Sequence, residues 1–148
     1  MIALHRFMAS CFGIGYLGKG GGTIAAAFAL ILWWGMSAFS GYGLRWQTLL
    51  VLGVTAIGVW SSYKVEPQWG KDNKKVVIDE VAGMFVSVIG LNFDIRIMAT
   101  AFVLFRFFDI VKPLFIKRME RLPGGWGVMA DDVLSGVYTN LLIRTLVC

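Results

Sequence analysis

The sequence is poor in the residues on which disulfide scaffolds, zinc sites and histidine chemistry depend. Its 148 residues include two cysteines, Cys11 and Cys148, at opposite ends of the chain, and one histidine, His5. There is no Cys-x-x-Cys pair and no histidine cluster, so we expect free thiols and neither a disulfide framework nor a zinc site. A single histidine disfavours mechanisms that need a paired or phosphorylated histidine. We expect His5 to be a surface residue.

Charge is absent from two long stretches of the chain. Thr23–Leu44 has no charged residue over 22 positions, enough for a transmembrane helix, and Trp46–Tyr63 is a second uncharged, mostly apolar run of 18. The hydrophobic share of 57% and the mean hydropathy of +0.71 exceed those of most soluble domains. The sequence therefore predicts one domain over residues 1–148, an all-α integral-membrane bundle of four to five hydrophobic helices.

Polar and glycine-rich stretches separate the apolar segments and predict the order of elements. Residues 1–12 form a short amphipathic lead-in, Ser40–Gly43 a turn, and the lysine-rich stretch Lys64–Val77 an extramembrane loop. Phe115–Leu122 is predicted to be an interfacial segment, and Pro123–Gly127 a hinge. The predicted helices are Thr23–Phe39, Trp46–Tyr63, Val76–Phe93, Ile97–Lys112 and Asp131–Val147.

Basic residues indicate which helix ends face the cytoplasm. They precede the first predicted helix, fill the loop after the second, and recur from Arg106 to Arg121 after the fourth, whereas Arg45 and Arg96 stand alone on the opposite side. By the positive-inside rule the N-terminus is cytoplasmic. This topology gathers seven charged residues at the cytoplasmic face: Lys19, Asp79, Glu80, Asp109, Lys112, Asp131 and Asp132.

The net charge of +5 indicates the kind of partner that the chain meets. A positive balance suits a protein beside anionic lipid headgroups. Nucleic acid is the weaker explanation, because the basic residues lie at helix ends rather than in one solvated block. We therefore expect a membrane and an anionic lipid as partners, and no nucleic acid.

The glycine-rich segment Gly13–Thr23 imitates two nucleotide-binding motifs. It matches Gly-x-Gly-x-x-Gly, and it matches a P-loop except that Gly20 replaces the final Ser/Thr. Both motifs need a preceding strand in an α/β unit, which this chain does not predict. Glycine N–H groups at a helix N-terminus can still bind an anion, with Thr23 as a cap and Lys19 adding charge. A flexible linker into the membrane is the alternative.

Three charged residues at spacings of three interrupt an apolar helix near its end. Arg106, Asp109 and Lys112 would form one polar stripe, and Pro113 is expected to kink the helix and free the carbonyl of Asp109. An Arg106–Asp109 ion pair that neutralises itself is one interpretation. A site that binds an anion and a metal together is the other, and further acidic residues favour it.

Those further acidic residues are two pairs, Asp79-Glu80 and Asp131-Asp132, each expected to open a helix. Carboxylates in a first turn suit the helix dipole, which would be a purely structural role. Each pair, however, is followed one turn later by a glycine, Gly83 or Gly136, at which a neighbouring backbone could approach closely.

Several carboxylates with Lys and Arg, and without useful His or Cys, indicate hard-cation chemistry on a phosphate. Mg²⁺ takes carboxylate, water and phosphate oxygens, cationic side chains neutralise the remaining charge, and bound water can supply hydroxide near neutral pH. Other phosphatase designs fit poorly. Leu17 stands where a cysteine phosphatase built on Cys11 needs arginine, and no Asp-x-Asp pair is present.

Taken together, these motifs resemble the phosphatidylglycerophosphatase A family, Mg²⁺-dependent enzymes of bacterial membranes that convert phosphatidylglycerophosphate to phosphatidylglycerol. The resemblance runs from Phe12 to about Leu142. Gly21 stands where the family often has proline, Ala25-Ala26 where it has Gly-Ser, and Phe115 where it has a second proline, while every acidic position is intact. The matching segments are Phe12–Gly15, Gly22-Thr23, Asp79–Gly83, Phe105–Pro113 and Gly124–Asp132.

The resemblance implies a multi-pass protein of the bacterial cytoplasmic (inner) membrane with its active site on the cytoplasmic face. The expected catalytic residues are Asp79, Glu80, Asp109, Asp131 and Asp132, with Asp79, Glu80, Asp131 and Asp132 as ligands of Mg²⁺. The expected phosphate-binding residues are Lys19, Thr23, Arg106 and Lys112. Another lipid-headgroup enzyme and a non-catalytic membrane subunit stay open, although the Asp-Gly-x-x-Ala-Arg signature of CDP-alcohol phosphotransferases is absent. The oligomeric state is not predicted.

Overall fold

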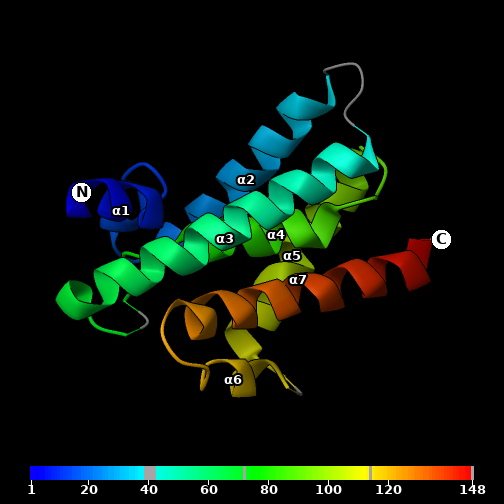
Figure 1. The fold of residues 1–148 in the computed structure, drawn as a ribbon. Helices are drawn as coiled ribbons and strands as arrows, with labels where there is room; N and C mark the ends of the chain where they lie inside the picture. Colours follow the sequence, from blue (N-terminus) through cyan, green and yellow to red (C-terminus); the bar gives the residue numbers. More distant parts are fainter. Residues whose placement is uncertain (39–42, 72, 114, 148) are drawn as a thin grey trace.

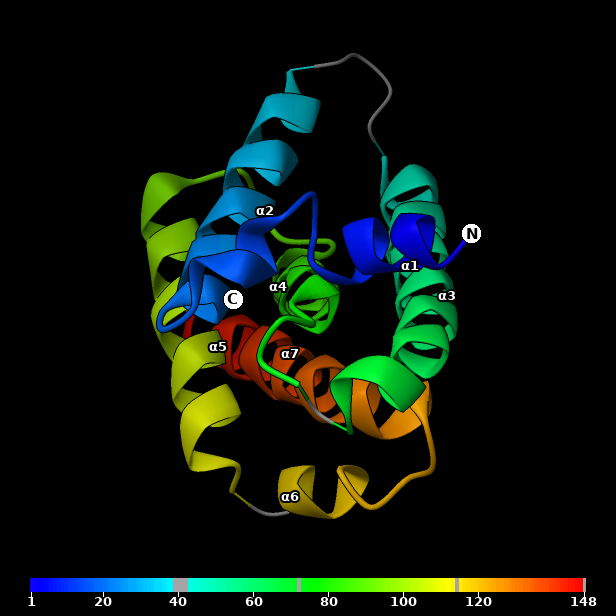
Figure 2. The ribbon, with the colours of Figure 1, turned by 90° about the vertical axis from the view of Figure 1, so that its left-hand side faces the viewer.

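The chain folds around one short, buried helix, α4 (Ile78–Val88). In the computed structural model, which describes residues 1–38, 43–71, 73–113 and 115–147, every residue of α4 except Glu80 is buried. Figure 2 shows α4 nearly end-on, with four longer helices around it, and it packs against all four. These are α2 (Gly21–Ser37), α3 (Leu44–Trp69), α5 (Ile95–Val111) and α7 (Gly125–Val147).

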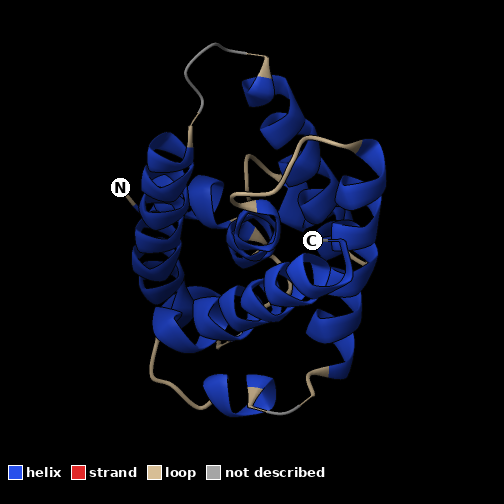
Figure 3. Cartoon of the chain, turned by 90° about the vertical axis from the view of Figure 1, so that its right-hand side faces the viewer, coloured by secondary structure: helices blue, strands red, loops and turns tan. Residues whose placement is uncertain are grey.

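Shorter elements complete the fold. Helix α1 (Ile2–Ala9) packs against α3, the 3₁₀ turn η1 (Ile14–Leu17) leads into α2, and α6 (Ile116–Met119) lies beside α7 (Figure 1). The described residues contain helices and no strands (Figure 3), which confirms the all-α prediction. The predicted turn at Ser40–Gly43 lies outside the described residues except for Gly43.

Two glycines allow α4 and α7 to cross in close contact. A Cβ on Gly83 would lie 2.6 Å from both the carbonyl oxygen of Asp132 and the Phe105 ring. A Cβ on Gly136 would collide with the carbonyl of Gly83 and lie 2.9 Å from the Cβ of Val86. The prediction that these glycines admit a neighbouring backbone is confirmed. The crossing fixes the acidic residues of the two helices at a short separation.

Helix α7 begins six residues earlier than predicted. Pro123–Gly127 was expected to be a hinge, yet the helix starts at Gly125, because the backbone of Gly125 packs directly on the Val59 carbonyl of α3. Asp131 and Asp132 therefore lie in the second turn of the helix, with no acidic residue in its first turn. The structural explanation by dipole and capping, weighed for this pair, is wrong, whereas Asp79 and Glu80 do occupy the first turn of α4.

Other helix ends also differ from the predictions. Helix α3 continues to Trp69 through part of the predicted loop, with Pro67 in its last turn. Helix α4 ends at Val88 rather than at Phe93, because the side chain of Asn140 on α7 binds its terminal carbonyls. His5, expected at the surface, is buried with its ring edge against Trp60, at 4.8 Å between ring centroids.

One helix among the described residues is long and apolar enough to cross a membrane, namely α3. Helix α2 is apolar but shorter, with 17 residues. Helix α4 has 11 residues, well below the ~20 that a span needs.

Candidate active site

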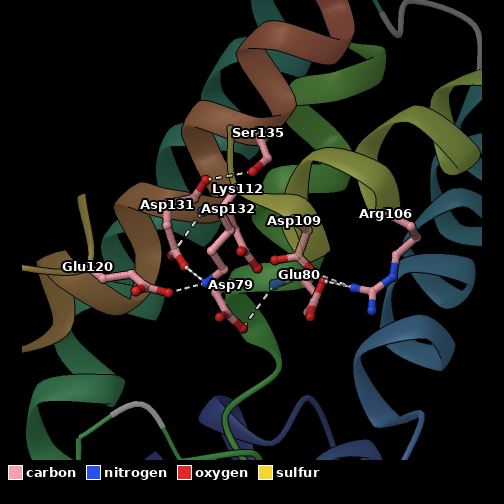
Figure 4. Close-up of polar contacts among 9 residues, drawn as sticks. All are labelled: Asp79, Glu80, Arg106, Asp109, Lys112, Glu120, Asp131, Asp132 and Ser135. Atoms are coloured by element: carbon pink, nitrogen blue, oxygen red, sulfur yellow. Dashed lines mark hydrogen bonds and ion pairs between the residues drawn. The ribbon is translucent and has the colours of Figure 1, made fainter. Parts of the chain in front are cut away.

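Three helices bring their acidic residues to one polar pocket. Asp79 and Glu80 come from the start of α4, Asp109 from the end of α5, and Asp131 and Asp132 from the second turn of α7 (Figure 4). The pocket has a volume of about 450 Å³. All five carboxylates and four cationic side chains line it: Asp79, Glu80, Asp109, Asp131, Asp132, Lys19, Lys74, Arg106 and Lys112.

Three of the carboxylates form a cluster that fits a metal ion. Oxygens of Glu80, Asp109 and Asp132 all lie within 4.8 Å of one another. Asp132 is 2% exposed, and its buried Oδ2 has no hydrogen-bond partner among the described residues. Because a buried anionic oxygen without a partner is costly, the cluster favours a bound cation. The set overlaps the predicted metal ligands at Glu80 and Asp132 and brings in Asp109, which had been assigned to catalysis alone.

Burial and mutual repulsion oppose ionisation of the carboxyl groups of Asp79 and Glu80 in the first turn of α4. Burial first, and then the neighbouring Glu80, Asp131 and Asp109, raise the pKa of Asp79 well above its ordinary value. Burial, followed by the nearby charge of Asp109, raises the pKa of Glu80 to about 7, although Arg106 acts in the opposite direction. In the absence of a cation, these carboxyl groups therefore hold protons at pH values where an exposed carboxyl group would be ionised.

Arg106 joins two members of the cluster. Its Nη1 donates to Glu80 Oε2 at 2.7 Å and to Asp109 Oδ2 at 2.5 Å. The predicted Arg106–Asp109 pair therefore exists, but it is part of a three-residue network rather than self-contained. Gly22 at the start of α2 leaves room for this network, because a Cβ there would collide with the Glu80 carboxylate.

Lys112 pairs with Asp131, which is not a member of the cluster. Helix α5 ends at Val111, and Lys112 has a left-handed backbone (φ 51°, ψ 56°), so Pro113 follows the helix end and does not kink it as predicted. The ammonium group donates to Asp131 Oδ2 at 2.8 Å and to Glu120. Burial alone would lower the pKa of Lys112, but these two hydrogen bonds raise it above its ordinary value. The side chain therefore stays charged.

The glycine-rich segment forms another part of the pocket wall. Residues 18–22 line it, with Lys19 among them, at the N-terminus of α2. Gly20 is the N-cap, with no side chain to donate or accept, so the prediction that Thr23 caps this helix is wrong. Thr23 is exposed and is not among the lining residues.

Sequence analysis missed two contributors to the pocket. Lys74 lines it, but in the sequence it was one of four lysines used only for topology. Glu120 binds Lys112, but it lies in a segment expected to rest at the membrane interface. Their spacing from the other site residues carries no period that could have identified them.

The pocket combines carboxylates suited to a divalent cation with cationic side chains and the backbone amides of a helix N-terminus. This combination is typical of a metal-assisted phosphatase. The comparison with protein families agrees. The model of the family Phosphatidylglycerophosphatase A matches residues 7–147, and the chain belongs to this family. It is thus a phosphatase that acts on a phosphate monoester.

Curated relatives span most of the chain. A protein of Bacteroides thetaiotaomicron, provisionally named a phosphatidylinositol-3-phosphatase, is 41% identical over 89% of this chain and 86% of its own length. Proteins named phosphatidylglycerophosphatase A from Haemophilus influenzae and Escherichia coli are 30% and 33% identical, over 93% and 80% of this chain and 85% and 69% of their own lengths. No solved structure gives a significant match.

Proposed function

We propose that this protein hydrolyses phosphatidylglycerophosphate to phosphatidylglycerol and phosphate, with Mg²⁺, at the cytoplasmic face of a bacterial inner membrane. The observation that carries the proposal is the juxtaposition, in one pocket, of a carboxylate cluster with a cationic, glycine-lined wall. The first feature suits a hard cation and the second a phosphate monoester. Membership of the family supports the same substrate class.

Glu80, Asp109 and Asp132 are the residues that would hold the metal. When bound, Mg²⁺ would neutralise phosphate oxygens and lower the pKa of coordinated water. Carboxylate oxygens without sulfur or imidazole favour Mg²⁺ over softer metals. Asp79 and Asp131 line the same pocket outside this cluster, and we assign them to substrate and water contacts rather than to the metal itself.

The cationic residues would orient the phosphate against the cluster. Arg106 is held by Glu80 and Asp109, so its guanidinium is fixed before substrate arrives. Lys19 forms no ion pair with another described residue and also lines the pocket, where it can meet the incoming phosphate. Asp79 lines the same pocket, and we assign to it the exchange of a proton with water or with the departing alkoxide.

Helix α3, which is long and apolar enough to cross a membrane, and the shorter apolar α2 support the proposed membrane location. The positive-inside rule puts Lys19 and Lys74 on the cytoplasmic side, and both line the active-site pocket. The pocket would therefore open toward the cytoplasmic headgroup layer, where a phospholipid presents its phosphates.

Phosphate release from phosphatidylglycerophosphate in mixed micelles tests the proposal. We expect turnover with Mg²⁺, loss of turnover in excess EDTA, and recovery when Mg²⁺ is restored. Full activity in EDTA would rule out the metal assignment.

A second substrate is favoured by the relative with 41% identity, whose name refers to phosphatidylinositol 3-phosphate. That lipid also carries a phosphate monoester on an anionic headgroup, so the same residues could bind it. Parallel assays with both lipids discriminate between them through kcat/KM. If kcat/KM is higher for phosphatidylinositol 3-phosphate than for phosphatidylglycerophosphate, the proposed substrate is wrong, but the assignment of the site residues still holds.

A further inference from the structure

A second hollow, of about 710 Å³, has an almost wholly apolar lining. It runs along one face of α3 and ends at the segment that leads into α7, where these helices pack together (Figure 2). We call it the α3–α7 groove. The lining residues used below are Leu52, Ala56, Trp60, Tyr63, Gly124 and Trp126.

The length and direction of the α3–α7 groove match one leaflet of a bilayer. Leu52 and Tyr63 are 11 positions apart, which is about 16 Å of helix rise, roughly half of a ~30 Å hydrocarbon core. Trp60, Tyr63 and Trp126 are 56%, 60% and 61% exposed. They lie toward the C-terminal end of α3, which the topology proposed above places at the cytoplasmic interface, where such aromatic side chains are enriched.

The α3–α7 groove continues into polar surface that leads to the active site. An adjoining hollow shares Tyr63 and Gly124 with it and adds Lys64, Glu66 and Lys71. The next hollow shares Lys71 and adds Glu120, whose carboxylate binds Lys112 in the wall of the active-site pocket. The surface therefore changes from apolar, through a patch that holds Lys64 and Lys71 beside Glu66, to the active-site pocket. This is the order in which a phospholipid presents acyl chain, phosphodiester and terminal phosphate.

We infer that the α3–α7 groove holds an acyl chain of a phospholipid substrate drawn from the cytoplasmic leaflet, with Lys64 and Lys71 beside its phosphodiester. The inference rests on the proposed function, because it assumes that the reacting phosphate belongs to a membrane lipid. It explains how the pocket would select a lipid over a soluble phosphate ester of the same headgroup. Part of the binding energy would come from a surface that the reacting phosphate never touches.

Filling the α3–α7 groove tests this inference. Ala56 is exposed, lines the groove and is not among the residues of the active-site pocket. We expect Ala56→Trp to raise KM for long-chain phosphatidylglycerophosphate about tenfold with kcat near wild type. Kinetics on the deacylated headgroup, glycerophosphoryl-glycerophosphate, should not change. The matched control is Ile57→Trp, which places the same ring on the next position of α3, outside the groove, and should leave both substrates unaffected.

Lys71→Gln examines the headgroup part of the inference. Both substrates keep the phosphodiester, so KM should rise several-fold for both of them, and more at low ionic strength. An unchanged KM for Lys71→Gln would remove the phosphodiester contact from the proposal. An unchanged lipid KM for Ala56→Trp, or an equal loss on both substrates, would overturn the acyl-chain site.

A binding measurement separates this inference from the proposed function. A phosphatidylglycerol with a photoreactive acyl chain, mixed into vesicles with the protein, should crosslink to α3 in the wild type and in Ile57→Trp, and several-fold less in Ala56→Trp. Wild-type protein that releases no phosphate but shows this pattern would refute the proposed function alone. Equal crosslinking of all three proteins would refute the groove.

Discussion

The two ends of α4 are both polar, but they are satisfied to very different degrees. At the C-terminal end, Asn140 donates to the carbonyls of Val86, Ser87 and Ile89, and Arg144 binds both Asn140 and Ile89. At the N-terminal end, carboxylates from three helices crowd together and Asp132 Oδ2 has no described partner. Polar groups at the first end complete the fold, whereas those at the second form the cluster that we propose to bind the metal.

Removing a carboxylate from the unsatisfied end gives the largest expected effect. Asp132→Asn keeps the shape of the side chain and removes one charge from the cluster, so we expect kcat to fall about 100-fold or more. The metal-free protein should be no less stable, because a repulsive buried charge is lost. Phosphate release and the thermal midpoint, each with and without Mg²⁺, measure both effects.

The control for this variant is Asp94→Asn. Asp94 caps α5 through its side-chain oxygen, a role that asparagine also fills, and it is not among the pocket residues. Near-normal kcat in Asp132→Asn would contradict the assignment of the cluster.

Breaking the satisfied end should instead cost stability. Asn140→Ala removes the side-chain donor from the carbonyls of Val86 and Ser87, while the Ile89 carbonyl keeps its hydrogen bond from Arg144. Each unsatisfied buried group costs about 1–3 kcal/mol. We expect a clear fall in denaturation midpoint in detergent, while kcat per folded molecule stays near wild type. If Asn140→Ala and Asp132→Asn lose activity and stability equally, the two ends of α4 do not have the different roles proposed here.

A change of pH should have a smaller effect, through the protonation of Glu80 at the N-terminal end of α4. The pKa of Glu80 is raised to about 7 in the fold, above the ordinary 4.5, so the protonated form is favoured in the metal-free protein. Its stability should therefore decrease as pH rises from about 4.5 to 7, because the folded state resists losing that proton. Mg²⁺ competes with the proton, so its apparent affinity should increase over the same interval. Thermal midpoints across pH, with and without Mg²⁺, measure both trends, and Glu80→Gln should flatten them.

The smallest expected effect lies on the glycine-lined wall. Lys19→Ala should raise KM roughly threefold to tenfold and lower kcat less, because in the proposed mechanism Lys19 would meet the phosphate both before and during reaction. Steady-state kinetics on one lipid at saturating Mg²⁺ measure the split. Lys117→Ala, an exposed lysine of α6 outside the pocket, should have no such effect. A larger loss in kcat than in affinity would give Lys19 a role in the transition state.

Local patterns predicted the elements of the site but not all of its pairings. Uncharged runs located α2 and α3, and charge within apolar sequence singled out Arg106, Asp109 and the two acidic pairs. Which carboxylates cluster depends on the angle at which α5 and α7 meet α4, and no local pattern encodes that angle. The sequence could not show that Lys112 adopts a left-handed backbone and pairs with Asp131.

The same limit explains the errors at helix ends. The start of α7 depends on the packing of Gly125 against α3, and the end of α4 depends on Asn140, more than 50 residues further along the chain. His5 is buried because α1 folds back on α3, where Trp60 covers its ring. Each of these three errors arose where a distant segment overrides local preference.

The regular spacing along α7 has a consequence for the sequences that this fold tolerates. Asp132, Gly136 and Asn140 are four residues apart, and all three face α4, as a cluster member, a crossing point and a lock on the helix end. One residue inserted between Asp132 and Asn140 would rotate one of them by about 100° relative to the other. Substitutions on the outer face of α7 leave the relative orientation of Asp132 and Asn140 unchanged. An insertion or deletion between these two residues would disrupt either the active site or the packing of α4.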